Sequence, residues 1–318
     1  MSLDSPCLCF EEVRQKALEL GFDDVGATRA EISDDHILAY RDWLSKGYQA
    51  GMGYMENTLR CRPQELLPGA KYAVLFVSYY KQARESFQSG KGVIASYARG
   101  RDYHQLHHRR LRKLISWIEE KIGKRGVAKG FSDSTPILEK ALAVQAGLGW
   151  FGKNTLVIHR KFGTFFLLAG LLLTCEIDQA VCVAKSARCG SCRRCLDACP
   201  AGALVSPYLL DSNRCLSYQL IENRGEIPPT VASQNPGYAF GCDICQDVCP
   251  HNVRTPLSTQ KAFLPESGMG SYLTVDRVNA TLDAPETYYG TPLKRQGPQG
   301  LLRNLQSLNP SSGEPLCP

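Results

Sequence analysis

Two runs of closely spaced cysteines constrain this chain more than any other feature. Eight of its fourteen cysteines lie between residues 189 and 249. The first run has the pattern C-x2-C-x2-C-x3-C-P, and the second, C-x2-C-x3-C-P, lacks only the first cysteine of that pattern. In a reducing compartment, clustered cysteines are more typical of metal ligands than of disulfides. The runs comprise Cys189, Cys192, Cys195 and Cys199, and then Cys242, Cys245 and Cys249.

This spacing is that of bacterial ferredoxins, in which three cysteines of a run bind one [4Fe–4S] cluster and the fourth binds the other. Cys249 and Cys199 are then the crossing ligands, and Cys215 is the only other cysteine in the segment. The alternative is a pair of structural zinc sites, but zinc does not explain the repeated run with its terminal proline. The predicted ligands are Cys189, Cys192, Cys195 and Cys249 for the first cluster, and Cys199, Cys215, Cys242 and Cys245 for the second.

The residues before the cysteine runs have the pattern of an α/β or α+β layered domain. Apolar periodicity predicts helices at 10–20, 103–121 and 136–146, and strands at 71–80, 127–131, 155–158 and 164–173. Beyond residue 180 the segments become short and rich in Cys and Pro, which is typical of a domain held together by its metal. We therefore expect an α/β domain over 1–180, a ferredoxin-like domain over 181–260 and a C-terminal tail over 261–318.

Length and charge narrow the functional classes. The 318 residues suit two domains, and the formal charge of +6 suits a polyanionic partner. The longest apolar run, 165–173, is far shorter than the ~20 residues that span a bilayer. The N-terminus lacks the basic and apolar regions of a secretory signal. We expect a cytoplasmic protein.

A glycine-rich segment, Gly147 to Lys153, matches the phosphate-binding patterns GxGxxG and GxxxxGK without their structural context. Both patterns require a strand before the loop and a helix after it. Here a predicted helix precedes the loop and a strand follows, and Asn154 stands where a P-loop has Ser or Thr. We predict neither a dinucleotide site nor an ATP site.

The predicted helix at 103–121 begins with a dense basic stretch. A solvated helix face and a surface that contacts phosphates explain such a run equally well. At its start, Asp102-Tyr103-His104 resembles the DxHxxG loop of cobalamin enzymes with a His ligand to cobalt, but His107 occupies the glycine position. We therefore predict a polar helix start and no His ligand.

Asp133 lies in the segment FSDSTPILEK, between a predicted strand and a predicted helix. It is either the N-terminal cap of a helix that begins near Pro136, or a general acid, because loops at strand ends carry chemistry. Spacing alone does not decide between the two roles.

Seven segments together resemble epoxyqueuosine reductases, the cobalamin- and iron–sulfur-dependent enzymes of queuosine synthesis in tRNA. They cover the chain nearly end to end. The most specific feature is that the segment at 132–154 occurs in the same chain as the cysteine segment at 189–204. The segments are SDSTPILEKALAVQAGLGWFGKN (132–154), CGSCRRCLDACPAGAL (189–204), RPQELLPGA (62–70), SYARGRDYH (96–104), RCLSYQLIE (214–222), YAFGCDICQDVCPHN (238–252) and GTPLKRQGPQGLLRN (290–304).

The resemblance implies base-off cobalamin in the N-terminal domain, two [4Fe–4S] clusters that reduce it to Co(I), and conversion of epoxyqueuosine in the anticodon loop to queuosine with loss of water. It implies that Asp133 donates a proton to the epoxide oxygen, with a pKa raised by burial near the corrin. The implied cobalamin pocket contains Arg60, Tyr97, Asp133, Lys153, Asn154, His159, Ser217 and Asp243. The implied tRNA contacts are Arg109, Arg110, Arg112, Lys294 and Arg295.

The resemblance further implies an external electron donor and a monomeric enzyme. Many family members carry a helical-repeat extension after the ferredoxin part, and we expect none here, which leaves the extent of tRNA contact open. Two alternatives also stay open. One is a cobalamin reductase with another substrate, such as a reductive dehalogenase, and the other is a plain two-cluster electron carrier.

Overall fold

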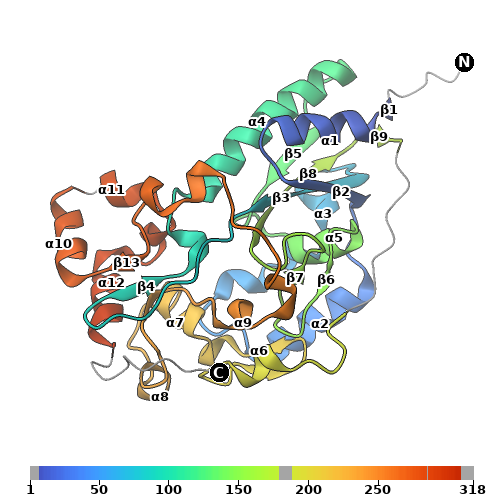
Figure 1. The fold of residues 1–318 in the computed structure, drawn as a ribbon. Coiled ribbons are helices and arrows are strands. Elements are labelled where there is room, and N and C mark those ends of the chain that lie inside the picture. Colours follow the sequence, from blue (N-terminus) through green and yellow to red (C-terminus); the bar gives the residue numbers. More distant parts are fainter. Residues whose placement is uncertain (1–6, 179–187, 285, 309–318) are drawn as a thin grey trace, which may run out of the picture.

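The computed structural model describes residues 7–178, 188–284 and 286–308 (Figure 1). At the centre of its N-terminal part lies a four-stranded sheet in the order β2-β3-β8-β5, with every neighbouring pair antiparallel. All eight residues of β3 are buried, because both faces of the sheet are covered. The strands are β2 (Asp24–Arg29), β3 (Tyr72–Tyr79), β5 (Ala128–Phe131) and β8 (Phe166–Leu173).

Helices pack on both faces of this sheet. On one face, Val74 and Phe76 of β3 share a core with α1 (Phe10–Glu19) and α4 (Tyr103–Ile122). On the other face, Leu75 shares a core with α5 (Glu139–Gln145). Val74 and Phe76 face one core and Leu75 faces the other because successive side chains of a strand point to opposite faces of the sheet. The mixed α/β expectation is thus confirmed, and the antiparallel pairing makes the domain α+β.

The predicted elements 10–20, 71–80, 103–121, 127–131 and 164–173 all form, with small shifts at their ends. Two predictions need correction. Helix α5 begins at Glu139 rather than near Pro136, because residues 133–137 form successive bends. The predicted strand 155–158 shrinks to β7 (Val157–Ile158), which pairs with β6 (Trp150–Phe151) in a short hairpin.

A second sheet joins distant parts of the chain. Strand β4 (Gly92–Ile94) pairs in parallel with β12 (Tyr238–Phe240) and antiparallel with β13 (Tyr272–Leu273). Helices α10 (Val275–Asp283) and α12 (Gly297–Gln306) share its core, at the left of Figure 1. The expected tail from residue 261 is therefore wrong for residues 261–284 and 286–308, which fold against a strand of the N-terminal half.

The two cysteine runs form short loop–helix units in the lower part of Figure 1. Helices α6 (Arg194–Asp197) and α9 (Ile244–Asp247) each contain a cysteine of a run. No helix in the described ranges is both long and apolar enough to cross a membrane. The remaining elements are β1 (Cys7–Leu8), α2 (Asp34–Ser45), α3 (Pro63–Leu66), β9 (Glu176–Ile177), β10 (Leu204–Ser206), β11 (Leu209–Leu210), α7 (Leu216–Ile221), α8 (Pro229–Ala232) and α11 (Glu286–Tyr289).

Candidate functional site

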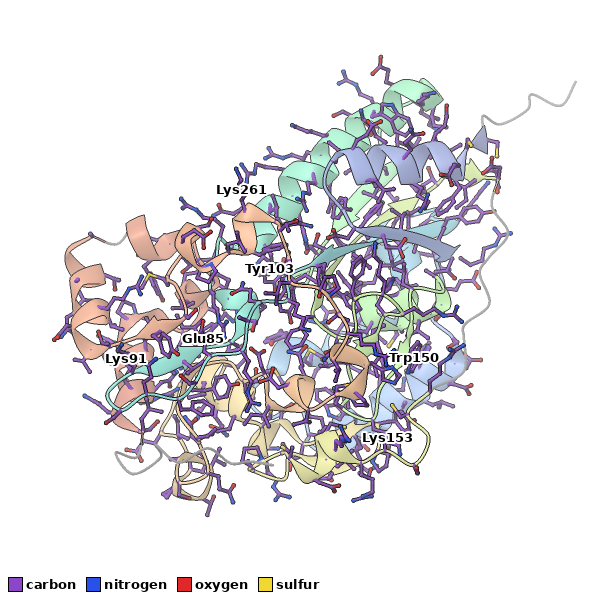
Figure 2. All side chains as sticks on the ribbon, in the orientation of Figure 1. Glu85, Lys91, Tyr103, Trp150, Lys153 and Lys261 are labelled. Atoms are coloured by element: carbon purple, nitrogen blue, oxygen red, sulfur yellow. The ribbon has the colours of Figure 1, made fainter. Side chains whose placement is uncertain are left out.

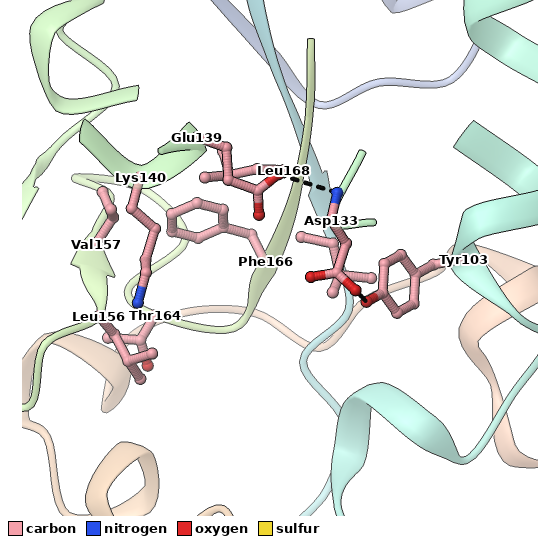
Figure 3. A pocket seen from close by; sticks show the side chains of 10 residues that line it. Tyr103, Asp133, Glu139, Lys140, Leu156, Val157, Thr164, Phe166 and Leu168 are labelled. Atoms are coloured by element: carbon pink, nitrogen blue, oxygen red, sulfur yellow. Dashed lines mark hydrogen bonds between the residues drawn. The ribbon is translucent and has the colours of Figure 1, made fainter. Parts of the chain in front are cut away.

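A cavity of about 120 Å³ lies beside β7, the start of β8 and the loop that precedes α5 (Figure 3). One part of its lining is apolar and contains Leu156, Val157, Phe166, Leu167 and Leu168. The other part is polar and contains Tyr103, Asp133, Glu139, Lys140 and Thr164. The cavity therefore combines apolar side chains with polar and ionisable ones, and Asp133 and Tyr103 lie across it from Lys140 and Val157 (Figure 3).

Asp133 is held at this cavity by contacts from two helices. Its Oδ2 accepts hydrogen bonds from the Tyr103 hydroxyl and from His104 Nε2, each at 2.9 Å. Its backbone N–H donates to Glu139 Oε2 at 3.1 Å. The φ of Asp133 is +51°, a left-handed conformation that non-glycine residues seldom adopt. The N-cap of α5 is Leu138, so the interpretation of Asp133 as a cap is wrong.

His104 connects Asp133 to a second, buried carboxylate. Asp102 caps α4, accepting from the His104 backbone N–H at 3.0 Å, and it also binds His104 Nδ1 at 2.7 Å and the Lys294 ammonium. Burial of His104 opposes protonation, but the hydrogen bonds to Asp102 and Asp133 outweigh it and raise the pKa of His104 to about 9. The predicted polar helix start is thus confirmed, and at neutral pH the His104 ring is in its protonated, positively charged form.

The rise in the pKa of Asp133 that we expect beside a bound corrin stays a prediction, whereas the protein's own residues have the opposite effect. Burial pushes the pKa upward, but the hydrogen bond and charge of His104 outweigh burial, and the pKa of Asp133 is lowered. In Glu139, by contrast, burial outweighs the contacts that lower the pKa. Burial, and then the charge of Asp133, raise the pKa of Glu139 to about 7. At neutral pH His104 is therefore protonated and lies one hydrogen bond away from Asp133, while Glu139 is near the midpoint of its titration.

The first predicted set of cysteines gathers around Cys249. Burial, and after it the neighbouring thiols of Cys189, Cys195 and Cys192, raise the pKa of Cys249 to about 11. Cys249 comes from the second run and the other three come from the first. The fold thus brings together the four thiols that the crossing rule groups.

The second predicted set also lies together. Burial raises the pKa of Cys245, and the nearby thiols of Cys215 and Cys199 raise it further. Cys242 has Cys245 and Cys215 as neighbours in the same way. All eight cysteines are free thiols. In the described residues, no three His, Cys, Asp or Glu side chains are grouped as the ligands of a single metal ion.

The glycine-rich segment that fails as a phosphate loop instead contacts both cysteine sets. Lys153 Nζ donates to the carbonyls of Gly190 and Cys192 at 2.7 and 2.9 Å. Asn154 Nδ2 donates to the Cys245 carbonyl at 3.3 Å. The side chains of Lys153 and Asn154 therefore hold the iron–sulfur loops, and the contacts to cobalamin predicted for them stay predictions.

Two other predicted pocket residues serve the fold. His159 is buried, and its Nε2 pairs with Asp24 at 2.9 Å while its Nδ1 accepts from the Lys161 and Phe162 backbones. Both ring nitrogens are thus engaged, so the structure does not support His159 as a cofactor contact. The buried Asp243 accepts from the Ser96 backbone and hydroxyl at 2.7 and 2.8 Å.

The other three predicted pocket residues are Arg60, Tyr97, which lies near Asp133, and Ser217, which lies beside Cys215 of the second cysteine set. Arg60 is 8% exposed, and its Nε donates to the Tyr54 carbonyl at 3.3 Å. The Tyr97 ring lies 6.2 Å from that of Tyr103, and the charge of Asp133 adds to burial in raising the pKa of Tyr97. The backbone N–H of Ser217 donates to the Cys215 thiol.

The predicted RNA contacts fall into two groups. Arg109 and Arg112 are exposed on α4, whereas Arg110 donates to Ser78 Oγ at 3.3 Å and to Gln260 Oε1 at 3.0 Å. Arg110 therefore has structural partners, and the RNA contact predicted for it stays a prediction. Lys294 pairs with Asp102, as described above.

Arg295 pairs with Glu222 at 2.6 Å, and its guanidinium carbon lies 5.5 Å from the centre of the Tyr54 ring. The charge of Arg295 also contributes to lowering the pKa of Asp133. Tyr54 is 46% exposed and was not predicted. No motif marks it, because its importance comes from neighbours that are distant in sequence. His104 and Glu139 were also missed, although both lie in the segments that carry the resemblance.

Comparisons with known proteins agree with this arrangement. A family model described as "Epoxyqueuosine reductase QueG, DUF1730" matches residues 60–134, and one described as "4Fe-4S double cluster binding domain" matches residues 188–252. The epoxyqueuosine reductase of Pseudomonas aeruginosa is 37% identical over 96% of this chain and 86% of its own length. The chain belongs to the epoxyqueuosine reductase family. It is therefore an oxidoreductase with a 4Fe–4S double cluster binding domain.

Further members of the epoxyqueuosine reductase family match to a similar extent. The enzyme of Synechocystis sp. is 38% identical over 86% of this chain and 96% of its own length. A crystal structure of epoxyqueuosine reductase with an epoxyqueuosine-modified tRNA-Tyr stem loop superposes with a TM-score of 0.84 at 27% identity. It covers 93% of this chain and 80% of the solved one.

Proposed function

We propose that this chain reduces epoxyqueuosine in the anticodon loop of tRNA to queuosine, the last step of queuosine biosynthesis, with cobalamin and two [4Fe–4S] clusters as its cofactors. The observation that carries the proposal is the pair formed by Asp133 and protonated His104, beside an apolar wall and in the same fold as two sets of four thiols. A plain electron carrier would have no use for such a pair.

The reaction needs two electrons and two protons. The two C–O bonds of the epoxide break, a C=C bond forms, and the oxygen leaves as water. An alkoxide is a poor leaving group unless it is protonated, so a donor must stand at the epoxide oxygen. Asp133 fills this role, and because its carboxylate is ionised it must first receive a proton. His104 supplies that proton across the 2.9 Å hydrogen bond.

The cavity residues suit one part of a cobalamin. A corrin is a flat, largely apolar ring with polar amide arms, and the cavity combines five apolar side chains with Glu139, Lys140 and Thr164 at its edge. Bound cobalamin would deliver the reducing electrons to the epoxide carbon. His104 and His107 each engage both ring nitrogens within the fold, which supports cobalamin binding without either of them as a cobalt ligand, and the base-off form remains part of the proposal.

The two sets of thiols suit two cubic clusters, one for each set of four ligands. We assign the first to Cys189, Cys192, Cys195 and Cys249, and the second to Cys199, Cys215, Cys242 and Cys245. Two clusters pass electrons singly, so an external donor must reduce them in two steps.

For the RNA, we propose that Arg109 and Arg112 contact phosphates and that Arg295, beside the exposed Tyr54 ring, faces the anticodon loop. Sequence-specific readers of RNA stack unpaired bases on aromatic rings and guanidinium planes. Such a surface next to Asp133 suits a base that has been turned out of its loop. With tRNA as its substrate, the enzyme would act in the cytoplasm.

The test is anaerobic turnover. The protein is reconstituted with iron, sulfide and cobalamin, reduced, and incubated with tRNA that carries epoxyqueuosine, and the digested nucleosides are analysed by mass spectrometry. We expect the modified nucleoside to lose the mass of one oxygen, and no change in parallel reactions without cobalamin. An unchanged nucleoside in the presence of bound corrin and reduced clusters would refute the proposal that epoxyqueuosine in tRNA is the substrate.

A further inference from the structure

Trp150 of β6 holds a buried hydrogen-bond donor that has no partner. Its side chain is 3% exposed, and its Nε1 is one of three buried side-chain polar atoms without a partner in the described residues. A buried polar group left unpaired loses its hydrogen bonds to water and gains none in the protein. Native proteins seldom tolerate this cost without a function or an absent partner.

The surroundings of Trp150 point to that partner. Trp150 belongs to a small buried cluster with Ile158 and Cys249, against which Cys189 packs, and both cysteines are of the first cysteine set. On its other sides are the ring of His251, 5.2 Å away and edge-on, and the Arg188 guanidinium at 5.8 Å. A guanidinium accepts no hydrogen bond, and Trp150 Nε1 makes none to the His251 ring, so the acceptors that remain among these neighbours are sulfur atoms.

The other tryptophans lack this combination. Trp43 donates its indole N–H to the Leu210 carbonyl at 2.7 Å. Trp117 packs at the edge of the core on α4, beside Lys121 and far in sequence from any cysteine run. Only Trp150 pairs an unsatisfied N–H with predicted cluster ligands among the described residues.

We propose that Trp150 is a positioning residue of the first cluster, and that its indole N–H donates a hydrogen bond to a sulfur of the cluster held by Cys189, Cys192, Cys195 and Cys249. The inference rests on the proposed function only in that this set holds a [4Fe–4S] cluster. A hydrogen bond to sulfur stabilises the more negative, reduced cluster, so it raises the reduction potential.

The hairpin β6–β7 explains how Trp150 comes to be placed there. A Cβ on Gly149 would stand 2.3 Å from the Ile158 carbonyl oxygen, so only glycine permits this close turn. Figure 2 shows Trp150 and Lys153 on the same side of the molecule, and Lys153 holds the loop of the first run through two carbonyls. The GxGxxG pattern of this chain is therefore a docking hairpin for the first cluster.

The test compares Trp150→Phe, which keeps an aromatic ring and removes the N–H, with Trp117→Phe as a matched control. Both reconstituted proteins and the wild type are titrated with reductant and followed by electron paramagnetic resonance. We expect Trp150→Phe to make reduction of one cluster about tenfold less favourable, which is about 59 mV for one electron, with iron content and the other cluster unchanged. The control should match the wild type.

Equal potentials in Trp150→Phe and the wild type, at full iron content, would overturn the inference and leave the proposed function intact. A wild type without [4Fe–4S] signals would overturn the proposed function itself. If Trp150→Phe does not load iron, the wild type labelled with ¹⁵N-tryptophan decides the question. A ¹⁵N hyperfine coupling to a reduced cluster is expected, and its absence would refute the hydrogen bond.

Discussion

The pairing of His104 with Asp133 leads to a specific prediction about the Asp133→Asn variant. The rise in the pKa of His104 from 6.5 to about 9 corresponds to about 3 kcal/mol favouring the protonated ring. Asp102 and Asp133 share this effect, each through a hydrogen bond. Removing one carboxylate charge should therefore lower the pKa of His104 by about one unit.

The direction of the pKa shift of His104 determines the pH range in which the pair stabilises the protein. Because the pKa of His104 is raised on folding, the pair stabilises the protein fully below pH 6.5 and loses its contribution as the pH rises through about 9. The assay is a titration of ¹³C-labelled histidines by nuclear magnetic resonance. A His104→Gln variant assigns the signal among the six histidines, and Asp35→Asn, at an exposed position in α2, is the matched control.

Asp133→Asn should shift the His104 signal, and Asp35→Asn should leave the His104 signal unchanged. A wild-type His104 that titrates near 6.5, or one whose pKa is the same in Asp133→Asn, would refute the coupling. It would also remove the proposed proton source.

Three further predictions concern other parts of the molecule. Cys215→Ala should lose about half of the bound iron while the first cluster remains, and an unchanged iron content would contradict the ligand assignment. Arg112→Ala should weaken tRNA binding in a filter assay and reduce the dependence of binding on salt. Arg110→Ala should instead lower the melting temperature, because Arg110 bonds Ser78 and Gln260. The reverse result would contradict the assignment of Arg112 to RNA and of Arg110 to the fold. Leu75→Ala, at a fully buried β3 position, should cost about 2–5 kcal/mol of unfolding free energy in denaturant titrations, and a cost under about 1 kcal/mol would question the two-sided core.

The sequence predicted the features that depend on local pattern. The apolar run of β3 and the amphipathic spacing of α4 identify the sheet and its long helix, and the cysteine spacing identifies the two sets of thiols that the fold brings together. The position of Asp133 was also predicted, but its ionisation was not. That property depends on His104, which lies 29 residues away in the chain.

Apart from the start of α5, which depends on local bends, the features that the sequence did not reveal come from pairing between distant segments. Strand β4 looks unremarkable in sequence, yet it pairs with β12 and β13 and so draws the expected tail into the fold. Arg110 sits in a basic run but faces Ser78 and Gln260, and no periodicity shows that a charged residue has polar partners inside. The bonds of Lys153 and Asn154 to cysteine-loop carbonyls also join distant segments, and the glycine pattern gives no sign of them.

The central claim is that Asp133 protonates the epoxide oxygen during reduction of epoxyqueuosine. The most direct test is a single turnover with Asp133→Asn, loaded with iron, sulfide and cobalamin and reduced before tRNA carrying epoxyqueuosine is added, beside the wild type and Asp35→Asn. The account predicts that Asp133→Asn retains full iron and corrin content and binds tRNA, yet leaves the epoxide intact, while the other two proteins convert it to queuosine. Conversion by Asp133→Asn at the wild-type rate would contradict the account.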